Sequence, residues 1–203
     1  MSSPELPPRR EGSHHDTVSM HCVDTGAAAA YARVKERLYA VNTWRELNDS
    51  IRADFQVCDP SGRKVYRRPH KGDYIRIDLP GPGSPAGGGY DWVRVADLAE
   101  EDGLAPWASL TVMPAADPRG QGTDIAHFYA EGATNTFVVR RIGNCILVEV
   151  HGRNERPNVT EGGRLDRLRN EAVALAGKVG LGKVQWKDWT DGMVSVIEPQ
   201  ANG

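Results

Sequence analysis

The segment from Ala133 to Glu155 limits the fold of this 203-residue chain more than any other part of the sequence. Two runs rich in Val, Ile, Thr and Phe flank Gly143-Asn144, a dipeptide that permits the positive φ angles of a tight two-residue turn. We therefore predict a β-hairpin. Closing the turn at this dipeptide sets three cross-strand pairs: Ile142 with Cys145, Val138 with Glu149, and Thr136 with His151.

The two faces of the predicted hairpin differ in polarity. Because side chains alternate along a strand, one face is almost entirely apolar and carries Phe137, Val139, Ile146, Val148 and Val150, interrupted by Arg141. The other face mixes Val138 and Leu147 with ionisable groups, among them Arg140, Glu149 and His151. The more continuous apolar face is the better candidate for the core. Which face looks inward at a cavity decides the function of these residues.

The composition argues against two classes of protein. Twenty-five basic and 27 acidic residues give a formal charge of −2, whereas a dedicated nucleic-acid binder shows a strong basic excess. No apolar run approaches the ~20 residues that cross a bilayer. We expect neither nucleic acid nor a membrane as a partner. Residues 1–16 contain no apolar secretory core and are predicted to be a disordered leader.

The cysteines and histidines indicate neither a disulfide framework nor a metal site. Cys22, Cys58 and Cys145 are far apart, and an odd number at such spacing favours reduced thiols in a cytoplasmic protein. His21 and Cys22 are adjacent, so in a strand they face opposite sides and cannot chelate one ion. Without an HExxH motif, a CxxC pair or a calcium-loop pattern, we predict no metal and no cofactor.

The remaining patterns place strands between two helical regions. A strand is predicted at Thr17–Val23, followed by a helix that begins near Thr25 and a second short helix after Asn42. A strong amphipathic helix is predicted at Arg164–Lys178, and Trp186 and Trp189 could continue helical structure beyond it. Between these regions, strands are predicted at Asp54–Cys58, Tyr74–Leu79, Trp92–Leu98 and Leu110–Met113, and Ile125–Tyr129 leads into the hairpin.

This order of elements resembles the helix-grip fold of the START-like superfamily. That superfamily includes polyketide cyclases and dehydratases, lipid-transfer domains and plant hormone-binding proteins. The resemblance covers residues 17–190 and leaves 191–203 as a loosely ordered tail. It implies an α+β fold, in which a curved antiparallel sheet of six to seven strands packs on a long C-terminal helix and leaves a cavity between them.

Three functions follow as hypotheses. The first is a cavity that binds a small apolar or aromatic ligand, a usual property of concave apolar sites with a few polar groups. The second is a polyketide cyclase- or dehydratase-like enzyme, with Glu149 or His151 as general base and Arg140 holding an anionic oxygen. The third is an interaction module, such as a homodimer subunit, without a cavity. Ion pairs on a solvated sheet face are the alternative explanation for Arg140, Glu149 and His151.

Further residues are expected to contact a ligand. Arg141 either clamps an anion inside the cavity or extends to the sheet edge. The glycine-rich connection 79–92 could act as a lid, and aromatic and acidic residues stand near its base and before the hairpin. The predicted ligand contacts are thus Arg141, Tyr74, Trp92, Tyr129 and Asp91.

Overall fold

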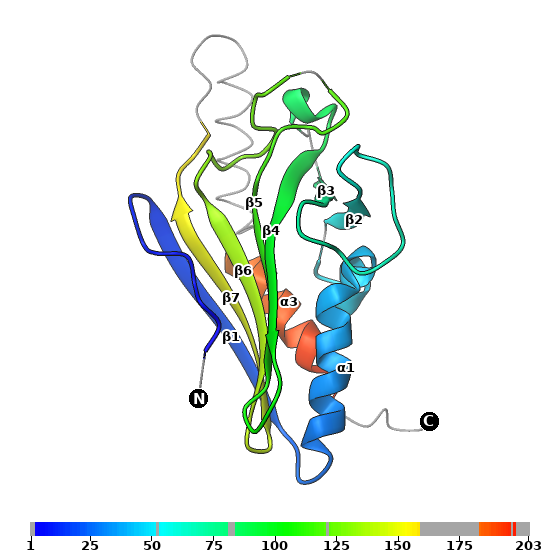
Figure 1. Ribbon diagram of the computed structural model, residues 1–203, viewed down its shortest axis with the longest axis vertical. Helices are drawn as coiled ribbons and strands as arrows, with labels where there is room; N and C mark the ends of the chain where they lie inside the picture. The colour runs from blue at the N-terminus through cyan, green and yellow to red at the C-terminus, as the bar shows by residue number, and fades with distance from the viewer. Residues whose placement is uncertain are drawn as a thin grey trace.

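Seven strands form one curved antiparallel sheet, with helices on one of its faces (Figure 1). The computed structural model describes residues 3–51, 53–80, 84–120, 122–158, 183–195 and 197. The strand order is β1-β7-β6-β5-β4-β3-β2. The strands are β1 (Ser13–Cys22), β2 (Asp54–Cys58), β3 (Tyr74–Asp78), β4 (Asp91–Glu101), β5 (Trp107–Pro114), β6 (Thr134–Ile142) and β7 (Cys145–Glu155).

The helices lie where the sequence predicts helical structure, within the described part of the chain. Helix α1 spans Ala27–Tyr39 and continues into a 3₁₀ helix, η1, at Val41–Leu47. Helix α3 spans Lys183–Ser195, and a short 3₁₀ turn, η2, occupies Pro85–Gly87. The predicted helix at Arg164–Lys178 lies outside the described residues.

The predicted hairpin is confirmed residue by residue. Strands β6 and β7 pair in the expected register, from Ile142 opposite Cys145 to Thr136 opposite His151. Gly143 adopts a φ of 61°, which glycine accommodates without the steric penalty of a β-carbon. The face with Phe137 is the inner face, because it packs against the helices as part of the main hydrophobic core.

Aromatic rings fill the space between the inner face and α3. The ring centroid of Phe137 lies 4.9 Å from that of Trp44, 5.1 Å from Trp186 and 5.0 Å from Trp189. Such tilted and edge-on contacts are the geometries that aromatic pairs prefer. Helix α3 is also held by the buried hydroxyl of Ser19, which donates to the Asp191 carboxylate over 2.5 Å. The predicted α+β helix-grip architecture is therefore present in the described residues.

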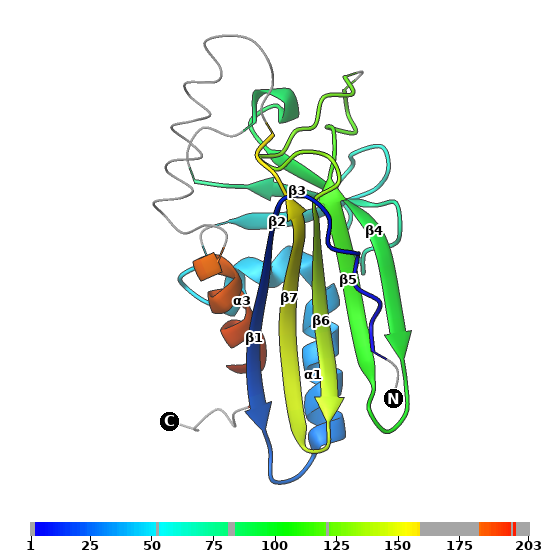
Figure 2. The ribbon, with the colours of Figure 1, turned by 90° about the vertical axis from the view of Figure 1, so that its left-hand side faces the viewer.

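The N-terminal region contributes more to the fold than predicted. Strand β1 begins at Ser13 rather than Thr17, so residues 13–16 are paired with β7 instead of belonging to a leader. Residues before β1 run across the outer face of the sheet, in front of β6 and β5 (Figure 2). They are held there by contacts such as the ion pair between Arg9 and Asp16 at 3.0 Å.

Ile125–Tyr129, which leads into the hairpin, is not one of the strands and forms a single bridge between Tyr129 and Pro157. The prediction of three reduced thiols was wrong. Cys22 and Cys145 are joined by a disulfide rather than being free thiols, because β1 pairs with β7 in a register that sets them opposite each other. Cys58 is free and buried, as expected. No helix in the described part of the chain has the length and apolar character that crossing a membrane requires.

Candidate functional site

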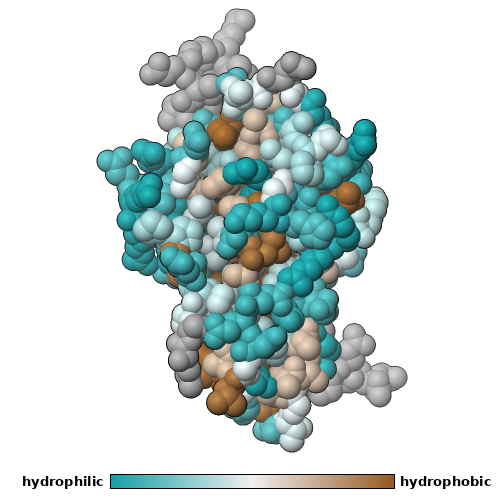
Figure 3. Space-filling view, in the orientation of Figure 1, coloured by the Kyte–Doolittle hydropathy of each residue, from teal (hydrophilic) through white to brown (hydrophobic). Residues whose placement is uncertain are grey.

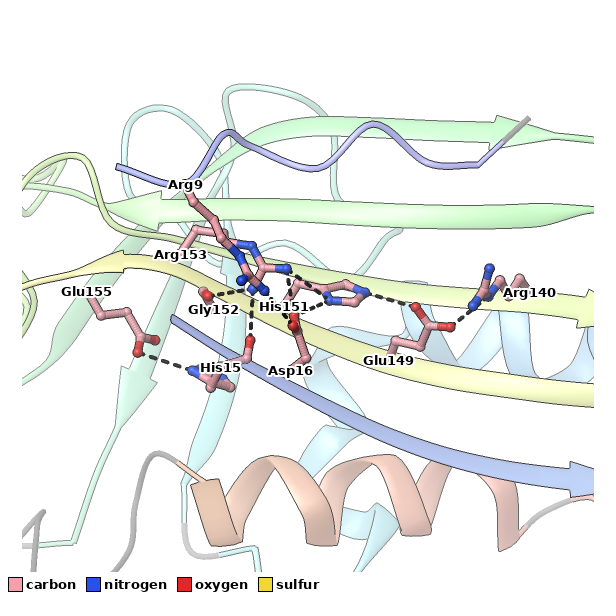
Figure 4. Close-up of polar contacts among 9 residues, drawn as sticks. All are labelled: Arg9, His15, Asp16, Arg140, Glu149, His151, Gly152, Arg153 and Glu155. Carbon is pink, nitrogen blue, oxygen red and sulfur yellow. Dashed lines mark hydrogen bonds and ion pairs between the residues drawn. The ribbon is translucent and has the colours of Figure 1, made fainter. Parts of the chain in front are cut away.

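A buried histidine–carboxylate pair lies on the inner face, at the end of the sheet where β1 begins and β7 ends. The Nδ1 atom of His15 is 3.1 Å from Oε2 of Glu155, and the side chains are only 6% and 4% exposed (Figure 4). The Ser13 hydroxyl contacts the same carboxylate oxygen at 3.5 Å. A buried charged group is tolerated when it is paired in this way.

Gly152 makes room for this pair. A β-carbon on Gly152 would lie 2.6 Å from Oε1 of Glu155 and closer still to the imidazole ring of His15. The strands are irregular just beyond this point, with a register shift between Ser13 and His15 and a left-handed Asn154 at φ 58°. This bulge turns the end of β7 so that Glu155 reaches His15.

Three polar atoms near Gly152 have no hydrogen-bond partner among the described residues. They are Nε2 of His15, Oε1 of Glu155 and Oδ1 of Asn135, and each atom is buried. Register places them together, because Gly152 is opposite His15 on one side and Asn135 on the other. The Tyr129 phenol is close by: burial, then the charge of the Glu155 carboxylate and a hydrogen bond with that side chain, raise its pKa. We call His15, Asn135 and Glu155 the inner polar cluster.

The predicted catalytic residues lie on the opposite, outer face of the sheet. Nε of Arg140 donates to Glu149 over 2.6 Å, and the other Glu149 oxygen is 2.9 Å from Nε2 of His151. Nδ1 of His151 is in turn 2.6 Å from the Asp16 carboxylate (Figure 4). The structure brings all three predicted residues together, but away from the helices.

The outer residues form a chain of alternating charges. Burial disfavours a charged His151 ring, but hydrogen bonds to Glu149 and Asp16 outweigh burial and raise its pKa. Burial likewise raises the pKa of Glu149, and contacts with His151 and Arg140 outweigh it, so the net shift is downward. Both ring nitrogens of His151 are engaged. We call Arg140, Glu149, His151 and Asp16 the outer ion-pair chain.

The predicted ligand contacts are spread over three places. Tyr129 lies beside the inner polar cluster. Arg141 shares the inner face but stands at its far end, where its guanidinium contacts the Leu104 carbonyl over 3.4 Å. Tyr74 and Trp92 pack in a second hydrophobic cluster with Cys58 and Ala126, and Asp91 is buried next to Trp92. The structure therefore does not gather these five residues into one site.

A surface depression lies at the end of β7. It has a volume of about 240 Å³ and is lined by Arg10, Glu11, Gly132, Asn154 and Arg156. Arg156 and Glu11 form an ion pair of 3.2 Å across it. No group of three or more His, Cys, Asp or Glu side chains in the described residues is placed to hold a metal ion.

His15, Asn135 and Glu155 were not among the predicted site residues. His15 fell within the predicted leader, and its meeting with Glu155 depends on strand pairing between distant segments. Two local signals did exist. Asn135 is polar on the face that otherwise carries Phe137 and Val139, and Gly152 interrupts a strand, which often marks a close approach by another group.

Comparison with known proteins gives a likeness of fold. No protein-family model matches the sequence, and a search of curated proteins finds no significant match. Among solved structures, a ginseng major latex-like protein from Panax ginseng is 10% identical, with 93% of this chain and 100% of that chain covered and a TM-score of 0.41. Norcoclaurine synthase from Thalictrum flavum is 8% identical, with 97% and 98% covered and a TM-score of 0.41.

A START superfamily protein from Mycobacterium smegmatis is also similar, at 14% identity, with 84% and 99% covered and a TM-score of 0.34. At such values no ligand, reaction or partner follows from these neighbours. The order of elements and the single seven-stranded sheet show that the described residues have an α+β helix-grip fold.

Proposed function

We propose that the protein binds a small, largely apolar molecule against the inner face of the sheet, with the polar end of that molecule at His15, Asn135 and Glu155. The observation that carries this proposal is the group of three buried polar atoms without a partner among the described residues. A buried polar group left without a hydrogen bond costs about 1–3 kcal/mol. Three together are best explained by a binding partner that supplies the missing bonds.

The residues around the inner polar cluster suit the apolar part of a ligand. In the sheet, Asn135 is opposite Val112 on β5. On β7, the inward-facing residue next to Gly152 is Val150. Both valines are buried. Ala133, just before β6, is also buried. Apolar walls with a few convergent polar groups are the usual composition of a small-molecule site.

Native mass spectrometry of protein purified from its own source tests the proposal, because it detects a co-purified small molecule. The released molecule is then added back to stripped protein while the histidine ring signals are followed by NMR. We expect the His15 signals to shift. His151 lies across the sheet on the outer face and serves as the internal control, so shifts of His151 alone would contradict the proposal.

Acid–base catalysis at the same place is a second candidate. A carboxylate that fixes one imidazole nitrogen and leaves the other without a partner is a recurrent arrangement of general bases. In such a reaction Nε2 of His15 would accept a proton and Glu155 would stabilise the charged ring. Turnover of the co-purified molecule, lost in His15→Gln while binding persists, would distinguish an enzyme from a carrier.

A homodimer is a third candidate, supported by apolar side chains on the outer face. Val18 and Met20 on β1 are 54% and 61% exposed, and Ile142 at the end of β6 is 48% exposed. In the view of Figure 3, hydrophobic residues reach the surface in several separate patches rather than one broad area. Light scattering of the wild type and of Met20→Glu tests this candidate, and a monomer at all concentrations would rule it out.

A further inference from the structure

The hydrogen-bonding character of the inner polar cluster specifies the chemical class of its ligand. Oε1 of Glu155 and Oδ1 of Asn135 are acceptors, the first on an ionised group. In the neutral tautomer that carries its proton on Nδ1, the atom that faces the Glu155 carboxylate, Nε2 of His15 is also an acceptor. Three acceptors on neighbouring strands require a partner rich in donors.

The charges around the inner polar cluster also favour a ligand with donors, and in particular a cationic one. Among the described residues, His15 is the only histidine, lysine or arginine paired with Glu155, and in its neutral tautomer it leaves the carboxylate charge uncompensated. The two arginines nearest to Glu155 along the chain are engaged elsewhere. Arg156 forms an ion pair with Glu11 at 3.2 Å. Arg153 donates to the carbonyl oxygens of His15 and Gly152 and contacts the Asp16 carboxylate at 2.6 Å on the outer side. Nothing in the described part of the cluster supplies a cation opposite Oε1 of Glu155.

We infer that the ligand carries a protonated amine, which is placed among Glu155, Asn135 and His15. A primary ammonium offers three N–H donors and one positive charge, so it matches the three acceptors and compensates the carboxylate. A hydroxyl supplies one donor and no charge, and a carboxylate would be repelled. This inference rests on the proposed function, which it narrows from a small apolar molecule to an apolar amine.

Three probes with one naphthalene body and different polar ends test the inference: 1-naphthylmethylamine, 1-naphthalenemethanol and 1-naphthoate. Affinities are measured by calorimetry on the full-length protein. We expect the amine to bind about tenfold more tightly than the alcohol, because hydrogen bonds to a charged group are stronger than neutral ones. The carboxylate should bind most weakly.

Two matched variants locate the effect. Glu155→Gln removes the inner carboxylate and should abolish the preference for the amine. Glu149→Gln removes the same charge from the same strand but on the outer face, and should keep the preference. If Glu155→Gln fails to fold, Asn135→Asp provides the complementary test, because an added carboxylate should increase the preference for the amine.

The outcomes test the amine inference and the proposed function separately. Equal binding of all three probes, or a preference that survives Glu155→Gln, would overturn the amine inference and leave the proposed function standing. If no probe binds the folded wild type, no small molecule co-purifies and the His15 signals never shift, the proposed function itself is overturned.

Discussion

The imidazole of His15 packs directly against Gly152, the residue opposite it on β7. Any β-carbon at position 152 would collide with the ring. The same β-carbon would lie 2.6 Å from Oε1 of Glu155. One residue without a side chain thus allows a histidine, a carboxylate and a strand backbone to meet in a buried space. The inner polar cluster depends on this absence of a side chain.

Gly152→Ala should therefore disrupt the cluster through steric overlap alone. The backbone angle of Gly152 is one that alanine can adopt, because its φ is not in the positive region. Overpacking of this kind costs about 1–3 kcal/mol of unfolding free energy, which urea denaturation would measure. Gly122→Ala is the matched control, since a β-carbon there meets no atom within 4 Å.

A double-mutant cycle shows whether the overlap with His15 is the cause. Adding His15→Ala to Gly152→Ala should recover part of the lost stability, since it removes the colliding ring. Strictly additive losses in the double variant would contradict the proposed close packing.

Reducing the Cys22–Cys145 disulfide should lower stability substantially. The bond links residues that are 123 positions apart, so it restricts the unfolded chain strongly. A loss of about 2–4 kcal/mol is typical for such a bond. Unfolding with and without dithiothreitol measures it, and the Cys22→Ser/Cys145→Ser variant should not respond to the reductant.

Thiol labelling provides a second check on the disulfide. Cys22 is exposed and Cys145 half-buried, whereas Cys58 is buried. After mild reduction of the folded protein, an alkylating agent should modify Cys22 and Cys145 but spare Cys58. Labelling of Cys22 before any reduction would show that the bond is absent.

Truncating Phe137 should be costly, because its ring lies at the centre of the aromatic contacts between β6, η1 and α3. It is 2% exposed and has three tryptophan rings within about 5 Å. Phe137→Ala should lower the unfolding free energy by about 3–5 kcal/mol. Val18→Ala, on the exposed outer face, should change it little, and equal effects of the two substitutions would argue against the described packing.

The hairpin was predictable because all of its determinants are local. Alternating side chains, β-branched residues and Gly143 at the turn fix its register within 23 residues, as the pairing of Val138 with Glu149 confirms. Which face of the hairpin faces the core was predictable in the same way, because apolar residues such as Phe137 and Val139 lie on one face. Local sequence patterns of this kind also recovered α1 and the strand Asp54–Cys58 with little error.

The disulfide and the inner polar cluster were not predictable because both depend on β1 pairing with β7. Cys22 meets Cys145, and His15 meets Glu155, only after segments more than 120 residues apart take one register. The sequence around His15 resembles a polar leader, and nothing local marks Ser13–Asp16 as a strand. The predicted placement in the cytoplasm rested partly on reduced cysteines, and the disulfide removes that support.

The outer ion-pair chain should make stability depend on pH in two opposite directions. The pKa of His151 is raised above its ordinary value of 6.5, so the stabilisation from its charged ring is complete below 6.5 and is lost as pH rises through the raised value. The pKa values of Asp16 and Glu149 are lowered from 3.8 and 4.5, so their stabilisation is lost as pH falls through the lowered values. The chain should therefore stabilise most between about pH 4.5 and 6.5.

The variant His151→Gln isolates the histidine part of this effect. The difference in unfolding free energy between wild type and variant should be larger at about pH 5.5 than at about pH 8.5. His70→Gln serves as the control, because His70 is exposed and has no ion pair among the described residues. A difference that is constant with pH, or that grows at alkaline pH, would show that His151 is not held in its charged form by Glu149 and Asp16.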